Sequence, residues 1–238
     1  MGAADNLLGM FRARLLLAAL VVAPLLSGCF GDEPTIAVLL DDATDTSSRA
    51  VDVERLTDRV ESTCDECRVR VYDAEGDAAT QKSQARQAQA ASADVVVVVP
   101  VDPDDLDTLT GGELPVVSLG ELVPGSDRFV GLESGPVPRQ VGSDIEAARD
   151  VVRGTEESMT YVPTGPMSDR AADLAVAYLA DNPVEGGVDV DGVESWLYSD
   201  REVTIDTLTS VLVAEGIVTL DDLCSGNTRA RCARLGLR

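Results

Sequence analysis

A set of five aspartates follows two apolar runs of the chain, residues 35–40 and 95–99. The set comprises Asp41, Asp42, Asp102, Asp104 and Asp105. If both runs are strands of one parallel sheet, their carboxyl ends lie at the same edge, where ligands of such sheets bind. Carboxylate oxygens are the ligands that Mg²⁺ prefers, so one hypothesis for this set is metal-assisted phosphoryl chemistry.

The composition opposes that enzymatic hypothesis. None of the 238 residues is a histidine, which removes Ser-His-Asp and Cys-His catalysis and histidine-ligated zinc. The single lysine, Lys82, leaves one candidate for a phosphate-binding or Schiff-base lysine. With 42 acidic against 19 basic residues and a net charge of −23, loop carboxylates are typical of the whole surface. We therefore expect no enzyme, no metal and no cofactor.

The same composition argues against nucleic acid as a partner. A phosphate-backbone binder needs a basic patch or stripe, which the charge of −23 disfavours. Aromatic residues make up 3% of the chain, too few to provide platforms for stacked bases.

Residues 1–28 have the pattern of an export signal. Arg12 and Arg14 precede an apolar run at 15–23, which is too short for a comfortable membrane span. The ending Leu26-Ser27-Gly28-Cys29 resembles a bacterial lipobox, so we expect cleavage before Cys29, its lipidation and a tether at 29–34. This places the protein on the extracytoplasmic face of the cell membrane. The alternative is an ordinary secretory signal with a chance cysteine.

Four further cysteines allow three disulfide pairings, among which the sequence cannot choose. They are Cys64, Cys67, Cys224 and Cys232. Disulfides persist outside the cytoplasm, and two local bridges, Cys64–Cys67 and Cys224–Cys232, are the simplest proposal. A four-cysteine zinc site is the alternative. A redox role for the C-x-x-C pair is disfavoured because it precedes a strand, whereas a reactive pair opens a helix.

Alternation of apolar runs and helical patterns predicts the fold class. Strands are expected at 35–40, 68–72, 95–99, 114–118 and 129–132, with helices at about 51–64 and 77–91. This order is typical of an α/β protein whose parallel, Rossmann-like sheet is wound on both faces.

Three segments resemble the type I periplasmic sugar-binding proteins, and within them the xylose-binding branch of ABC-transporter solute-binding lipoproteins. The first segment is 73–103, a D-x-x-x-Q-x-x-Q helix followed by a strand ending in Pro-Val-Asp. The second runs from Gly154-Thr155 through Ser158-Met159-Thr160-Tyr161 to 169–172, and the third is 206–237 with its cysteine pair. The resemblance implies a periplasmic-binding-protein lobe, a small sugar ligand, a membrane permease as partner and no chemistry.

By this resemblance the chain has an N-terminal lobe at 35–139, a reduced second-lobe and return segment at 140–200 and a C-terminal segment at 201–238. Cleavage of the leader leaves 210 residues, fewer than the roughly 250–300 that two lobes of typical domain size need. Most of the second lobe is therefore expected to be missing. The many apolar residues of 203–237 predict that this segment packs on the first lobe, and Trp196 is expected in a core or seam.

Five positions are implied as ligand contacts, and several depart from the family pattern. The candidates are Asp42, Arg49, Asp102, Glu121 and Glu133. Ala50 stands where the family has an aromatic after arginine, and Glu121 replaces an arginine, which exchanges five donors for acceptors only. Two functions follow: a lipid-anchored solute-binding protein of a sugar ABC importer, or a surface lipoprotein that has lost high-affinity sugar binding and serves as sensor, adaptor or remnant.

Overall fold

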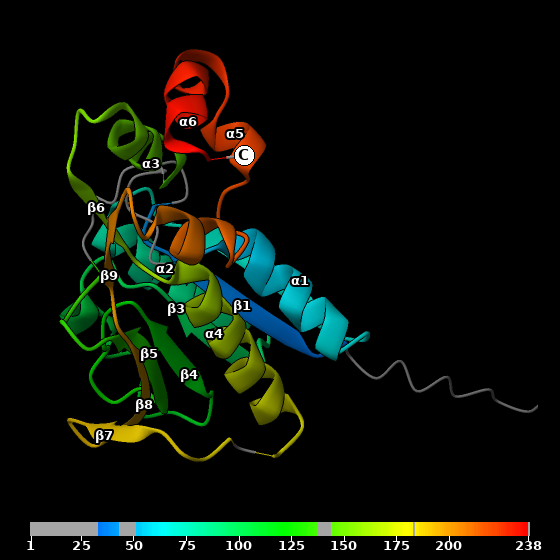
Figure 1. The fold of residues 1–238 in the computed structure, drawn as a ribbon. Coiled ribbons are helices and arrows are strands. Elements are labelled where there is room, and N and C mark those ends of the chain that lie inside the picture. The colour runs from blue at the N-terminus through cyan, green and yellow to red at the C-terminus, as the bar shows by residue number, and fades with distance from the viewer. Residues whose placement is uncertain (1–32, 43–50, 138–143, 183, 238) are drawn as a thin grey trace, which may run out of the picture. The chain divides into compact units, whose positions relative to one another are not determined.

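A seven-stranded sheet forms the centre of the computed structural model, which describes residues 33–42, 51–137, 144–182 and 184–237 (Figure 1). In spatial order its strands are β2 (Arg68–Asp73), β1 (Thr35–Leu40), β3 (Val95–Val98), β4 (Val116–Leu119), β5 (Arg128–Leu132), β8 (Val193–Tyr198) and β7 (Val188–Val190). All neighbours pair in parallel except β7, which is antiparallel to β8. The five strands expected from the sequence are confirmed, and β8 joins them from far along the chain.

Helices cover both faces of this sheet, as the fold class requires. One face packs against α1 (Val53–Thr63) and α4 (Thr164–Leu179), and the other against α2 (Ala78–Ala90) and the short η1 (Pro103–Leu106). Alternate residues of β1 divide between the two faces: Val38 joins the first cluster and Leu39 the second. Side chains of a strand alternate in this way with period two, so a continuous apolar run supplies both cores.

Local capping explains where the first two helices begin. The Asp52 carboxylate accepts a hydrogen bond from the Arg55 N–H at the start of α1. The Asp77 carboxylate accepts one from the Thr80 N–H at the start of α2. Each carboxylate satisfies a backbone donor that the first helical turn leaves without an intrahelical partner.

The remaining elements form a smaller unit with its own apolar core. They are α3 (Asp144–Arg153), β6 (Ser158–Tyr161), β9 (Arg201–Thr204), η2 (Thr209–Val213), α5 (Leu220–Leu223), η3 (Gly226–Thr228) and α6 (Arg229–Leu235). Strands β6 and β9 pair antiparallel as a separate two-stranded sheet. Within the stretch 140–200, α3 and β6 belong to this unit, whereas α4, β7 and β8 belong with the large sheet.

The C-terminal segment is buried, and its buried leucines lie in the core of the smaller unit. Leu208, Leu212 and Leu223 are fully buried in a cluster with Val152 of α3 and Tyr161 of β6, not with the residues on the large sheet. Because β9 pairs with β6, the chain that follows β9 begins beside this smaller unit.

Both local disulfides are present, Cys64–Cys67 between α1 and β2 and Cys224–Cys232 between α5 and α6. The C-x-x-C pair is therefore a bridge in the turn after a helix, as expected.

Trp196 is half-buried and packs against the first cluster, with the Arg170 guanidinium 5.9 Å from its ring centroid.

Candidate functional site

The carboxyl-terminal edge of the large sheet carries most of the predicted ligand contacts. Asp42 follows β1, Asp102 follows β3, Glu121 follows β4 and Glu133 follows β5. Ligands of open parallel sheets bind beyond this edge. Arg49 and the lipidation candidate Cys29 lie outside the described residues.

Gln81 of α2 fixes the backbone at this edge. Its side chain is buried, and its Nε2 donates to the carbonyl oxygens of Leu40 (3.1 Å) and Val99 (2.8 Å). Its Oε1 accepts from the Val101 N–H at 2.8 Å. One amide therefore joins the end of β1 to the end of β3, which explains physically why a glutamine stands at this position of the D-x-x-x-Q helix.

A first cavity of about 300 Å³ lies at the end of β1. It is lined by Leu40, Asp41, Asp42, Val51, Asp52, Val53, Glu54 and Val71. The Asp52 N–H donates to the Ser168 Oγ at 2.8 Å, so α4 holds the start of α1 at the cavity wall. Among the described residues this cavity has no aromatic lining and no basic side chain.

Two bidentate ion pairs hold α1 against α4 below that cavity. The Arg55 guanidinium binds both carboxylate oxygens of Asp169 (2.9 and 2.7 Å), and Arg59 binds those of Asp173 (2.7 and 3.2 Å). The hydrogen bonds that Arg55 donates to the Asp169 carboxylate raise the pKa of Arg55 above its ordinary value. Both guanidinium groups are therefore bound to carboxylates of α4 and are not available to a ligand.

A second cavity, of about 540 Å³, brings Glu121 and Glu133 to one site. It lies against β5 and β8 and also includes Leu122, Pro124, Gly125, Phe129, Leu132, Gly135, Pro136, Val190, Asp191, Val193 and Leu197. A Cβ at Gly131 would lie 2.1 Å from the Phe129 Cζ, so a side chain at this position would displace the ring from its place over its own strand.

Glu133 also lines a third cavity, of about 410 Å³, at the end of β8 together with Trp196 and Tyr198. Its carboxylate accepts from the Ser199 Oγ at 2.7 Å, and its N–H donates to the Tyr198 carbonyl at 2.9 Å. Sequence reasoning missed Ser199 and Tyr198, although the aromatic-rich segment Trp196-Leu197-Tyr198-Ser199 could have indicated a strand that ends at this edge.

The predicted contacts do not converge on one point. Asp42 and Glu133 follow strands separated by three strand spacings, which is roughly 14 Å. The Asp102 carboxylate accepts the Asp104 N–H at 3.0 Å and thereby begins η1. In the part of the chain that the structure describes, no three acidic or cysteine side chains are placed to hold a metal ion.

Comparison with known proteins shows the fold. The sequence matches no family model and no curated protein. Among solved structures, an ABC-transporter solute-binding protein from Clostridium phytofermentans with bound β-D-glucose has a TM-score of 0.62 at 10% identity, covering 79% of this chain and 99% of that one. The myo-inositol-binding protein of Caulobacter has a TM-score of 0.58 at 12% identity, covering 78% and 98%.

A third structure is the complex of the TorS sensor domain with TorT, solved without ligand. It has a TM-score of 0.53 at 10% identity and covers 72% of this chain and 92% of that one. The chain therefore has the α/β fold of the type I periplasmic binding proteins, as the sequence predicts.

None of the helices in the described ranges is long and apolar enough to cross a membrane.

Proposed function

We propose that this protein is an extracytoplasmic solute-binding protein that captures a small carbohydrate for an ABC importer without chemical conversion. The fold that it shares with glucose- and inositol-bound solute-binding proteins supports this proposal. The lipobox-like segment ending at Cys29 supports a lipid anchor on the extracytoplasmic face of the membrane. The xylose-type resemblance makes a pentose the first ligand to test.

The observation that carries the proposal is that Glu133, which follows β5, lines two cavities that lie along β5 and β8. A sugar offers an apolar C–H face and a ring of hydroxyl donors. Phe129 and Leu197 in one cavity, and Trp196 and Tyr198 in the other, supply apolar surface beside one carboxylate acceptor. Ser199 holds that carboxylate by a hydrogen bond of 2.7 Å.

Titration calorimetry of the mature protein against D-xylose, D-glucose and myo-inositol tests this proposal, with fluorescence as a second readout. Trp196 is the only tryptophan, so a ligand near Glu133 changes its emission. Glu133→Gln should weaken binding about tenfold or more, because a hydrogen bond to a charged group contributes about 1.5–3 kcal/mol. Asp104→Asn, an exposed carboxylate on η1, is the control that should leave binding unchanged.

A second function is favoured by the size of the smaller unit. Sugar-binding proteins of this fold close two lobes on the ligand. Here, among the described residues, the sheet of the smaller unit consists of the two strands β6 and β9. An open site leaves each hydrogen bond in competition with water, at about 0.5–1.5 kcal/mol net. The alternative is a surface adaptor or sensor lipoprotein, and likeness to the TorS–TorT complex supports it. Absence of binding across the sugar panel would contradict the transport proposal and favour this alternative.

A further inference from the structure

The short helix α6 carries three arginines that the rest of the protein leaves without partners. Arg229, Arg231 and Arg234 are all exposed, and no described residue lies within ion-pair or hydrogen-bond distance of their side chains. From Gly226 to Leu237 the chain has these three arginines and no acidic residue. In a chain with 42 acidic residues, such a segment is unusual.

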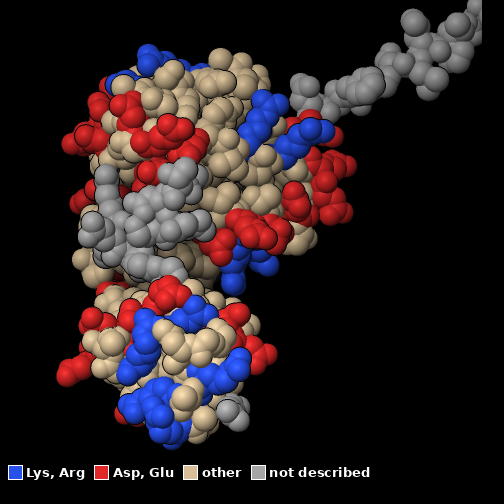
Figure 2. Space-filling view, turned by 90° about the horizontal axis from the view of Figure 1, so that it is seen from above, with Lys and Arg blue, Asp and Glu red and all other residues tan. Residues whose placement is uncertain are grey.

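Other basic residues in the described ranges are mostly neutralised. Eight of them form ion pairs: Arg55, Arg59, Arg68, Lys82, Arg128, Arg149, Arg153 and Arg201. Seen from the end of the molecule where α6 lies in Figure 1, Figure 2 shows basic side chains in several separate areas, with acidic side chains among them. Six described basic residues remain outside these ion pairs: three lie together on α6, whereas Arg70, Arg86 and Arg170 lie singly on β2, α2 and α4.

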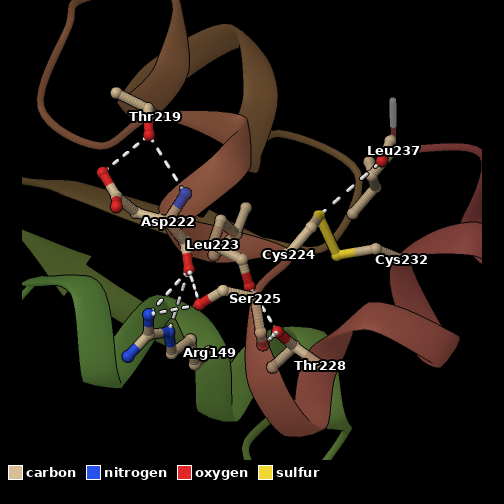
Figure 3. Close-up of a disulfide and its surroundings, with 9 residues drawn as sticks. All are labelled: Arg149, Thr219, Asp222, Leu223, Cys224, Ser225, Thr228, Cys232 and Leu237. Atoms are coloured by element: carbon tan, nitrogen blue, oxygen red, sulfur yellow. Dashed lines mark hydrogen bonds between the residues drawn. A yellow bond between two sulfur atoms is a disulfide. The ribbon is translucent and has the colours of Figure 1, made fainter.

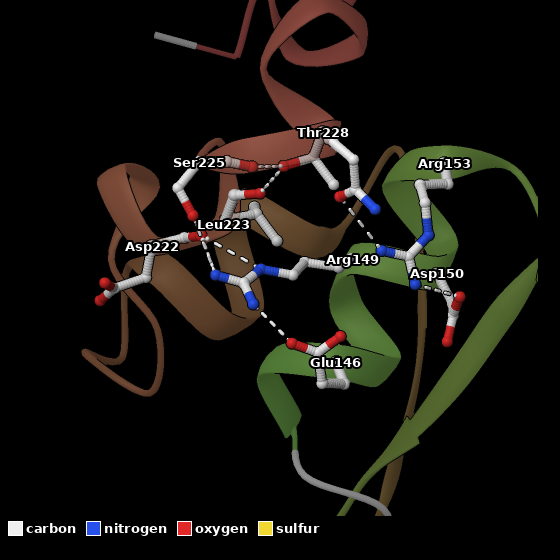
Figure 4. A network of polar contacts seen from close by, with 9 residues as sticks. Glu146, Arg149, Asp150, Arg153, Asp222, Leu223, Ser225 and Thr228 are labelled. Carbon is white, nitrogen blue, oxygen red and sulfur yellow. Dashed lines mark hydrogen bonds and ion pairs between the residues drawn. The ribbon is translucent and has the colours of Figure 1, made fainter.

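Two arginines of α3, Arg149 and Arg153, differ from those of α6 because both have partners within the smaller unit. Arg149 of α3 donates to the Asp222 carbonyl (2.7 and 3.2 Å) and to the Ser225 Oγ (3.0 Å), and it pairs with Glu146 (Figure 4). Arg153 pairs with Asp150 on its own helix and donates to the Asn227 Oδ1 of η3 at 3.5 Å. These two arginines hold α3 against the α5–η3 segment, and their positive charges are paired with acidic residues of the same unit.

The backbone that presents the free arginines is rigidly held. Cys232, in the middle of α6, is fully buried and bonded to Cys224 (Figure 3). The buried Thr228 hydroxyl, just before α6, lies 2.5 Å from the Leu223 carbonyl oxygen and 2.7 Å from that of Ser225. A partner therefore meets an already ordered helix, which lowers the entropy cost of association.

We propose that α6 is a docking surface for an acidic segment of a protein partner. Guanidinium groups bind carboxylates in bidentate geometry. The seven residues of α6 span about 10 Å, a length over which a short peptide segment can place a few carboxylates. A broad anionic lipid surface fits less well, because α5 packs beside α6 on α3 and exposes Asp221 and Asp222, which such a surface would repel.

Fluorescence anisotropy with a blocked, labelled hexaglutamate peptide at about 10 mM ionic strength tests the proposal, because the Debye length is then about 30 Å. We expect saturable binding by the mature protein and at least a tenfold loss in Arg229→Gln/Arg231→Gln/Arg234→Gln. The matched control is Arg70→Gln/Arg86→Gln, which removes two exposed arginines without described partners from β2 and α2 and should stay within about twofold of wild type. Far-ultraviolet circular dichroism and the melting temperature confirm that each variant is folded.

Three outcomes would overturn the proposal. One is no binding of hexaglutamate by the wild type, which would show that repulsion by the acidic residues of the rest of the protein outweighs the attraction of α6. A second is equal loss of binding in the triple variant and the Arg70/Arg86 control. The third is binding to phosphatidylglycerol vesicles as tight as that to the peptide and lost in the triple variant, which would assign the surface to lipid.

Discussion

Replacement of Gln81 tests how the carboxyl-terminal edge of the sheet is held together. Gln81→Met keeps the length of the side chain and removes its amide, so three hydrogen bonds to the ends of β1 and β3 are lost. At about 1 kcal/mol net for each bond, the free energy of unfolding should fall by about 3 kcal/mol. The Leu40 carbonyl keeps a hydrogen bond from the Ala74 N–H, so most of this cost falls on Val99 and Val101.

Urea denaturation followed by circular dichroism measures this loss. With an m-value of about 2–3 kcal/mol/M, the midpoint should fall by roughly 1–1.5 M with m unchanged. The matched control is Gln84→Met on the same helix. Gln84 donates a single hydrogen bond, to the Asp73 carbonyl (2.6 Å), and its Oε1 is buried without a hydrogen-bond partner, so its replacement should cost at most about 1 kcal/mol.

The pH dependence of Gln81→Glu gives a second readout. Burial and the two facing carbonyl oxygens disfavour a carboxylate here, so the introduced group should have a folded-state pKa above its unfolded value. The variant is then least stable above the folded pKa and regains stability as pH falls towards the unfolded pKa. Equal midpoints for Gln81→Met and Gln84→Met, or a Gln81→Glu variant with wild-type stability at pH 7, would refute the reasoning.

Three further predictions concern the smaller unit and the helix caps. Cys224→Ser/Cys232→Ser should lower the free energy of unfolding by about 2.5 kcal/mol through loop entropy, and a midpoint unchanged from wild type under non-reducing conditions would contradict this. Leu212→Ala, at a fully buried position, should cost about 2–5 kcal/mol, whereas a cost below 1 kcal/mol would show that the unit is loosely packed. Hydrogen bonds from Thr80 lower the pKa of Asp77, so the cap stabilises the fold above the unfolded pKa and this contribution is lost as pH falls through the folded pKa. Asp77→Ala should therefore lower the urea midpoint at pH 7 and approach wild type at low pH, and a difference that does not change with pH would count against an ionic cap.

The sequence alone determined the local features of the larger part of the molecule. The short apolar runs 35–40 and 95–99 predict strands buried on both faces, and in the structure their alternate side chains enter two apolar cores. Likewise, Cys64 and Cys67 can meet across a tight turn without any distant part of the chain.

Only the tertiary structure decided which distant segments meet. The sequence pattern shows that 203–237 is apolar, but pairing of β9 with β6 determines that α3, not the large sheet, covers it. In the same way, β8 beside β5 brings Ser199 and Tyr198 to Glu133, whereas the order of strands separates Glu133 from Asp42. Hydrophobic periodicity records which face of an element is buried and carries no information on its partner, because apolar contact is not directional. Charge count has the same limit: the sequence shows three arginines near its end, but only the fold shows that no acidic residue of the described chain reaches them.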